Sequence, residues 1–248
     1  MRHFKHQILF ILIVLYSCGH DNQSRKVQSA SIDILHNDTL FKNFDTLENK
    51  WNSRPVNFDT LYRLAKQLNN QADNYPNRKE IKLTEIYKRC ADIYRAQQFP
   101  DCDPNKSQLL CSKDTLLIID CYKKAIGIFQ SNSNSLSGSS TDAIILSSSF
   151  ADAMFQLADV YEQLGKFQLA LPYRQEYLAL LLRTEKPNLE MVADAYMYLG
   201  SNYELQKDYR TAYKFYLKEL ENNKTDNYRN LKNVESRIMK FKKEHNLE

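Results

Sequence analysis

The sequence predicts an all-α fold, a helical-repeat superhelix (α-solenoid) that ends in a C-terminal capping helix. The chain has only five glycines and six prolines in 248 residues, whereas sheet proteins use glycine at their many turns. Apolar residues recur at steps of three and four in successive segments, which is the spacing of one helix face. One segment also recurs at a spacing of 42 residues, and internal repeats of this length are typical of solenoids.

The first 17 residues are predicted to be a signal peptide. Two basic residues precede a nine-residue apolar run at 8–16, which is too short to span a membrane. The run ends in a segment that resembles the bacterial lipobox: Leu15, Ser17 and Cys18 match, while Tyr16 stands where a small or branched residue is usual. The resemblance implies cleavage before Cys18 and lipid attachment to that cysteine. The alternatives are an ordinary secretory signal and a short buried strand.

Residues 18–56 are predicted to be a polar tether and N-terminal segment. The residues directly after Cys18 are polar and have too few apolar side chains to form a core. Gly19 follows the cysteine, whereas lipoproteins retained in the inner membrane have Asp there. We therefore expect a lipid-anchored protein of the bacterial cell envelope, in the outer membrane, on its periplasmic face or its surface.

Residues 142–223 hold two copies of a pattern of two helices. In each copy a small residue among large ones on the first helix lets a second helix approach closely, and an aromatic residue and an alanine open that second helix. The first copy places these positions at Met154, Leu157, Ala158, Tyr161, Phe167 and Ala170, and the second at Tyr196, Leu199, Gly200, Tyr203, Tyr209 and Ala212. Gly165 suits the turn between the helices of the first copy. The pattern resembles the tetratricopeptide repeat in its 42-residue form, which implies protein–protein binding; a generic helical bundle is the alternative.

Residues 57–130 are predicted to be an N-terminal helical part with one degraded repeat. The first-helix spacing recurs at Tyr87, Cys90, Ala91 and Tyr94, and the second helix is expected at 115–130, after an inserted loop that contains cysteines. An earlier helix face is expected to be a half repeat or a cap; its residues are Phe58, Leu61, Ala65, Leu68 and Ala72.

Two further segments complete the predicted organisation. Residues 131–141 are rich in serine and are expected to be a linker. Residues 224–248 are predicted to be a capping helix, with an apolar face formed by Leu231, Val234, Ile238 and Phe241. A polar outer side on such a helix keeps a solenoid soluble.

The composition excludes several classes of enzyme. No histidine occurs in residues 37–244, which excludes most histidine-based catalysis and His zinc motifs. Asp101 and Asp103 resemble the opening of a calcium loop, but Lys106 and Ser112 stand where Gly and Glu are needed. The sequence therefore predicts no enzyme, no cofactor and no metal site.

Four cysteines follow Cys18. An even number in an exported chain favours disulfides, with three connectivities open. Cys102 and Cys111 share the inserted loop and are the disulfide candidate, whereas Cys90 and Cys121 fall on packed helices as buried thiols or a second bridge. Zinc is the competing interpretation, although no C-x-x-C pair occurs.

In the tetratricopeptide family four positions of each first helix line a concave groove. They fall here on Asp152, Phe155, Asp159, Glu162, Asp194, Met197, Ser201 and Glu204. At about 100° per residue these positions point away from the packing face. The five carboxylates favour a basic or neutral peptide or helix as partner, with Phe155 and Met197 as anchors. A solvated acidic face that binds nothing is the alternative.

The charge agrees with a protein partner. The net charge is +4, and a chain cleaved before Cys18 loses Arg2 and Lys5 and no acid, which leaves 32 basic against 30 acidic residues. Near-neutral charge and export argue against nucleic acid. We expect a scaffold or assembly factor that binds one or more envelope proteins through the groove. An envelope receptor that binds a small ligand or a glycan in the groove is the alternative.

Overall fold

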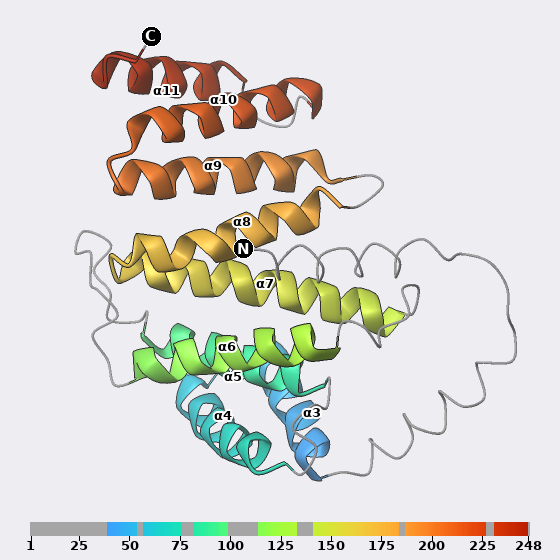
Figure 1. The fold of residues 1–248 in the computed structure, drawn as a ribbon. Helices are drawn as coiled ribbons and strands as arrows, with labels where there is room; N and C mark the ends of the chain where they lie inside the picture. Colours follow the sequence, from blue (N-terminus) through green and yellow to red (C-terminus); the bar gives the residue numbers. More distant parts are fainter. Residues whose placement is uncertain are drawn as a thin grey trace, which may run out of the picture. The chain divides into compact units, whose positions relative to one another are not determined.

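The computed structural model of this protein describes residues 39–53, 57–75, 82–98, 114–132, 141–183, 187–226 and 231–247 (Figure 1). Within these ranges the chain forms helices and no strand, which confirms the predicted all-α repeat fold. The predicted signal peptide, Cys18, Cys102, Cys111 and residues 133–140 of the predicted linker lie outside the described ranges.

The chain divides into two compact units, Met1–Ala153 and Met154–Glu248. The boundary lies inside one helix, whereas the sequence places a linker at 131–141. The first unit contains α3 (Thr39–Asn52), α4 (Phe58–Asp73), α5 (Leu83–Gln98), α6 (Asp114–Asn132) and the start of α7 (Thr141–Gln163). The second contains the rest of α7 and α8 (Phe167–Leu181), α9 (Leu189–Leu205), α10 (Tyr209–Asp226) and α11 (Leu231–Glu244).

In the first unit each helix packs on its neighbour in the sequence, α3 on α4, α4 on α5 and α5 on α6. Such local packing is the defining property of a solenoid. The predicted helices at 58–72 and 115–130 are present as α4 and α6. On α5 the four positions assigned to the degraded repeat, Tyr87, Cys90, Ala91 and Tyr94, are all buried.

Helix α3 lies within the segment predicted as a polar tether and N-terminal segment. It buries Leu40, Phe41 and Leu47 and packs on α4, so the expected half repeat is one member of a helix pair. The apolar spacing of Leu40, Phe44, Leu47 and Trp51 is helical. Apart from Phe41, the residues between these four positions are polar, and such a composition is also typical of a tether.

In the second unit the repeat positions form the packing faces that the sequence predicts. Met154, Leu157, Ala158, Leu199 and Ala212 are all buried. Gly200 occupies the small-residue position of the second copy, and a Cβ atom there would overlap the ring of Tyr216 on α10. A larger residue at this position would therefore push α9 and α10 apart.

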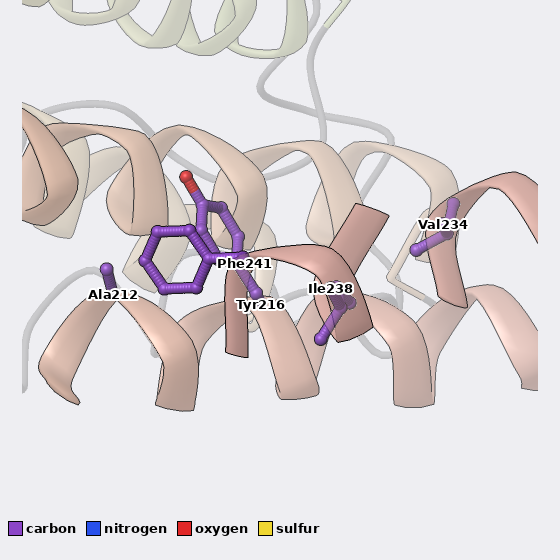
Figure 2. Packing of buried hydrophobic residues seen from close by; sticks show 5 residues of the cluster. All are labelled: Ala212, Tyr216, Val234, Ile238 and Phe241. Carbon is purple, nitrogen blue, oxygen red and sulfur yellow. The ribbon is translucent and has the colours of Figure 1, made fainter. Parts of the chain in front are cut away.

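The capping helix is present as α11 (Figure 1). Its Val234, Ile238 and Phe241 form one buried cluster with Ala212 and Tyr216 of α10 (Figure 2). The Phe241 and Tyr216 rings meet edge-on, with centroids 5.2 Å apart. This cluster covers the apolar face that α10 would otherwise expose at the end of the repeats.

The turns between the paired helices of the two copies have the same backbone geometry. Gly165 has a φ of 68°, and Lys207, 42 residues later, has a φ of 65°. In the first turn Lys166 N donates to Tyr161 O at 2.8 Å, and in the second Asp208 N donates to Tyr203 O at 2.9 Å. These are the bonds of a helix C-terminus closed by a left-handed residue. Glycine fits that conformation, whereas lysine is strained in it.

Candidate functional site

The eight predicted groove residues are all half-buried. Asp152 belongs to the first unit, and the other seven lie on α7 and α9 of the second unit. The seven are accompanied by a buried residue that the sequence analysis did not single out, Arg174 of α8, which is 1% exposed. Its position suggests that the carboxylates of α7 serve the fold as well as any partner.

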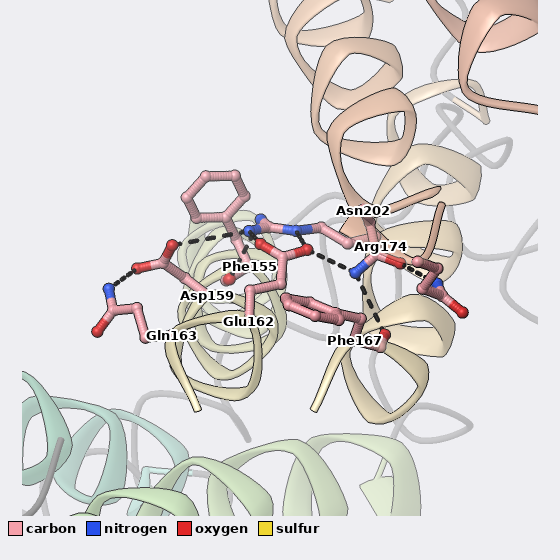
Figure 3. Close-up of polar contacts among 8 residues, drawn as sticks. Phe155, Asp159, Glu162, Gln163, Phe167, Arg174 and Asn202 are labelled. Carbon is pink, nitrogen blue, oxygen red and sulfur yellow. Dashed lines mark hydrogen bonds and ion pairs between the residues drawn. The ribbon is translucent and has the colours of Figure 1, made fainter. Parts of the chain in front are cut away.

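Arg174 binds the carboxylates of α7 (Figure 3). Its Nη2 donates to Glu162 Oε2 at 2.6 Å and its Nε donates to Glu162 Oε1 at 3.2 Å. The same Nη2 lies 3.9 Å from Asp159 Oδ1. A buried guanidinium needs such paired oxygens because an uncompensated charge is costly to remove from water. Two of the five predicted groove carboxylates therefore neutralise an internal charge.

Aromatic rings enclose the same guanidinium. The Arg174 guanidinium carbon lies 4.5 Å from the centre of the Phe155 ring and 4.6 Å from the centre of the Tyr198 ring. Phe155 also packs against Tyr177, with ring centroids 5.4 Å apart. Such contacts of a cation with ring faces are attractive. Phe155, predicted as an anchor for a partner, is thus also a support for Arg174.

Asn202 connects this cluster to the next helix. Its Nδ2 donates to Glu162 Oε1 at 2.8 Å and to the Phe167 carbonyl at 3.2 Å. Its own Oδ1 accepts from Gln206 Nε2 at 2.7 Å. Asn202 is fully buried on α9, so one amide joins the end of α7, the start of α8 and α9. Such a satisfied network holds the neighbouring side chains in one arrangement.

In both copies a glutamate of the first helix accepts a hydrogen bond from the second helix, but the donor residues differ. Glu204 stands 42 residues after Glu162, and Tyr216 stands 42 residues after Arg174. Tyr216 Oη donates to Glu204 Oε2 at 2.5 Å. Burial and this bond to a carboxylate raise the pKa of the Tyr216 phenol. In each copy a glutamate of the first helix thus binds a donor twelve residues later on the second helix.

The first unit binds Asp152 internally. Lys88 Nζ lies 2.6 Å from Asp152 Oδ2 and 2.9 Å from Asp92 Oδ2. Burial lowers the pKa of Lys88, but the two carboxylates outweigh burial and raise it overall. Asp92 also accepts a hydrogen bond from Tyr122 Oη at 2.7 Å. Asp152, Asp159, Glu162 and Glu204 therefore hold partners within the protein, and these carboxylates serve the fold whether or not they also contact a binding partner.

The described cysteines are buried free thiols and do not form a second bridge. Cys90 Sγ donates to the Ala65 carbonyl and Cys121 Sγ donates to Asn69 Oδ1, both at 3.4 Å. Burial raises the pKa of both thiols. In the described part of the chain no group of His, Cys, Asp and Glu side chains could hold a metal ion. No helix in the same ranges is long and apolar enough to cross a membrane.

A depression of about 440 Å³ lies at the turn between α7 and α8 and is open to solvent. It is lined by Gly165, Lys166, Phe167, Gln168, Leu169 and Gln206. None of the eight predicted groove residues borders it.

Comparison with known proteins identifies the repeated segment. Residues 149–225 match the family described as tetratricopeptide repeat. This segment is therefore similar to tetratricopeptide repeats. The match covers α8, α9 and most of α7 and α10. Tetratricopeptide repeats are a scaffold for protein–protein interaction, and such repeats are typically not catalytic.

Among solved structures, the crystal structure of BtubC (BKLC) from P. vanneervenii is similar to this chain at 17% sequence identity, with a TM-score of 0.36. The similarity covers 92% of this chain and 86% of that chain. No curated protein sequence matches this chain.

Proposed function

We propose that this protein is a lipid-anchored cell-envelope protein that binds other proteins through its tetratricopeptide repeats. It acts as a scaffold or assembly factor, with its anchor at Cys18 in the outer membrane. The match of residues 149–225 to the repeat family carries this proposal. The lipobox-like residues Leu15, Ser17 and Cys18 support the anchor.

The binding surface that we propose is the α7–α9 face of the second unit. Phe155 and Met197 provide half-buried apolar contacts on it. The network around Arg174 holds Phe155 in place, and a preorganised surface loses less entropy on binding. Because Arg174 offsets Glu162 and Asp159, the face is less acidic than the sequence suggests. A neutral helix or peptide with an apolar anchor therefore suits it better than a strongly basic one.

Capture of partners from solubilised envelopes tests this surface. We expect the wild type to retain a stoichiometric protein partner and Met197→Glu to lose it, because a new charge would be desolvated in the contact. Leu169→Glu is the matched control, since Leu169 is 51% exposed on α8. Both variants should keep the far-ultraviolet circular dichroism of the wild type. Retention of the partner by Met197→Glu, or loss of it in both variants, would contradict the proposed surface.

Metabolic labelling with palmitate tests the anchor separately. Cys18→Ala should remove the label, because the thiol and the new amino group of Cys18 are the acylation sites of a lipoprotein. Two or more acyl chains are enough for stable anchoring. Equal labelling of the wild type and Cys18→Ala would rule the anchor out.

A further inference from the structure

The outer face of α11 is cationic. Val234, Ile238 and Phe241 define the buried side of this helix. At about 100° per residue the opposite side is formed by Lys232, Ser236, Met239, Lys240 and Lys243, and all five are exposed. Among these solvent-facing positions of α11 there is no acidic residue. Lys240 lies 3.7 Å from Glu244 at the edge of this side, but both side chains are more than half exposed, so this ion pair is weak.

The net positive charge of the whole chain is concentrated in the segment that contains α10 and α11. Of 34 basic and 30 acidic residues, eleven and seven lie in residues 207–248. That difference equals the net charge of +4, so the remaining residues carry equal numbers of each sign. Helix α10 contributes Arg210, Lys214 and Lys218 to its own exposed side, and Glu221 is also exposed on this helix.

Arginine has a different role from lysine on α11. Arg237 Nη2 donates to Glu219 Oε2 at 2.5 Å, and its guanidinium carbon lies 4.7 Å from the centre of the Tyr216 ring. Glu219 is fully buried on α10, so Arg237 attaches α11 to the repeats. The basic residues of the outer side are therefore all lysines, and Met239, which is 62% exposed, lies among them.

We propose that the outer face of α11, formed by Lys232, Met239, Lys240 and Lys243, docks on an anionic phospholipid surface. Charge complementarity selects an anionic partner. Lysine is a compact charge that suits a diffuse anionic surface, whereas arginine suits a defined bidentate acceptor. Lys232 and Lys243 are about 16 Å apart along the helix axis, so a flat surface can meet the whole row. Met239 in the centre of the row adds an apolar contact that headgroups and the adjoining acyl chains accept.

This inference rests on the membrane location in the proposed function and adds a second contact to the anchor. The test measures binding of the full chain carrying Cys18→Ala to phosphatidylcholine vesicles with and without phosphatidylglycerol. The apolar run at 8–16 contributes to binding of both vesicles, so the ratio of the two partition coefficients reports electrostatic binding. Arg2 and Lys5 add to this ratio equally in every variant. The test variant adds Lys232→Gln, Lys240→Gln and Lys243→Gln. The control variant adds Lys42→Gln, Lys50→Gln and Arg63→Gln, which remove the same charge from exposed positions on α3 and α4.

Each lysine near an anionic surface is worth roughly a fivefold change in partitioning, so the test variant should lower the ratio about a hundredfold. The control variant should lower the ratio less than about tenfold, because its charges do not share the proposed face. Raising the salt concentration should reduce the ratio measured for the chain that carries Cys18→Ala alone. An unchanged ratio in the test variant, or an equal loss in both variants, would overturn the proposal. Binding of polyglutamate to the same variants is measured in parallel. If the test variant loses polyglutamate binding but keeps the vesicle ratio, the face binds acidic protein and the proposal is overturned. Palmitate labelling and partner capture do not depend on these lysines, so failure here leaves the proposed function intact.

Discussion

Replacing Glu162 with alanine should destabilise the second unit more than any single change at the surface. The substitution removes both oxygens that bind Arg174, at 2.6 and 3.2 Å, and an acceptor of Asn202 at 2.8 Å. Arg174 is 1% exposed, so water cannot replace these bonds without local opening. Removing one partner of a buried ion pair costs about 3–5 kcal/mol. Asp159, already 3.9 Å away, and the ring of Phe155 offset part of this, so we expect about 3 kcal/mol.

Arg174→Met should cost less than Glu162→Ala. Methionine fills similar space without a buried charge, and the remaining Glu162 side chain is 14% exposed and keeps its bond from Asn202. We expect a loss of about 1–2 kcal/mol. The double variant should be close to Arg174→Met alone, because no charge remains unpaired. The coupling energy of the pair should therefore be about 2–3 kcal/mol.

Urea unfolding followed by far-ultraviolet circular dichroism measures these free energies. Repeat proteins can unfold in parts, so amide hydrogen exchange across α7, α8 and α9 should confirm where protection is lost. Gln175→Ala, exposed on the same helix beside Arg174, is the control and should change stability by less than about 0.5 kcal/mol. A Glu162→Ala variant as stable as this control, or single effects that simply add in the double variant, would refute the structural role given to Arg174.

Three further predictions concern backbone positions and buried thiols. Gly200→Ala should destabilise by about 1–3 kcal/mol in thermal unfolding, because its Cβ overlaps a ring of α10. Gly127→Ala meets nothing within 4 Å and should stabilise α6 by about 0.5–1 kcal/mol; equal effects would contradict this contrast. Lys207→Gly should stabilise by about 1 kcal/mol in urea by relieving a positive φ, and a loss of stability would argue against strain there. Cys90 and Cys121 should resist iodoacetamide in the folded protein, since burial raises the pKa of both thiols. Because unfolded thiols lose protons above about pH 8.5 while the folded ones keep them, urea midpoints should fall as the pH rises further; rapid native alkylation or flat midpoints would refute this.

Most of the fold could be predicted from the repeat pattern in the sequence. Residues on one helix face are buried together, so their spacing of three and four is visible before any tertiary contact is known. The turn at Gly165 could be predicted from the sequence because its left-handed backbone conformation favours glycine. Helix α3 shows the limit of this approach. Its apolar positions, such as Leu40 and Leu47, have helical spacing but lie among polar residues, and only packing on α4 distinguishes them from a tether.

The sequence gives the helix face on which the groove candidates lie, but it does not give the side chains that surround them. The spacing of Asp159 and Glu162 placed them on the face away from the core, and there they are half-buried. Their partners are decided by contacts that cross helices: Arg174 lies twelve residues from Glu162, and Asn202 lies forty residues from it.

For the repeats, the sequence by itself determined which segments form helices and which helix faces are buried, because these depend on local periodicity and backbone conformation. Only the tertiary structure decided that Arg174 is buried between Phe155 and Tyr198 and that Glu162 neutralises it. In a linear pattern an arginine on a second helix looks like a solvated charge. Whether it is solvated depends on the packing of the neighbouring helices, which brings Glu162 of α7 and Tyr198 of α9 against Arg174.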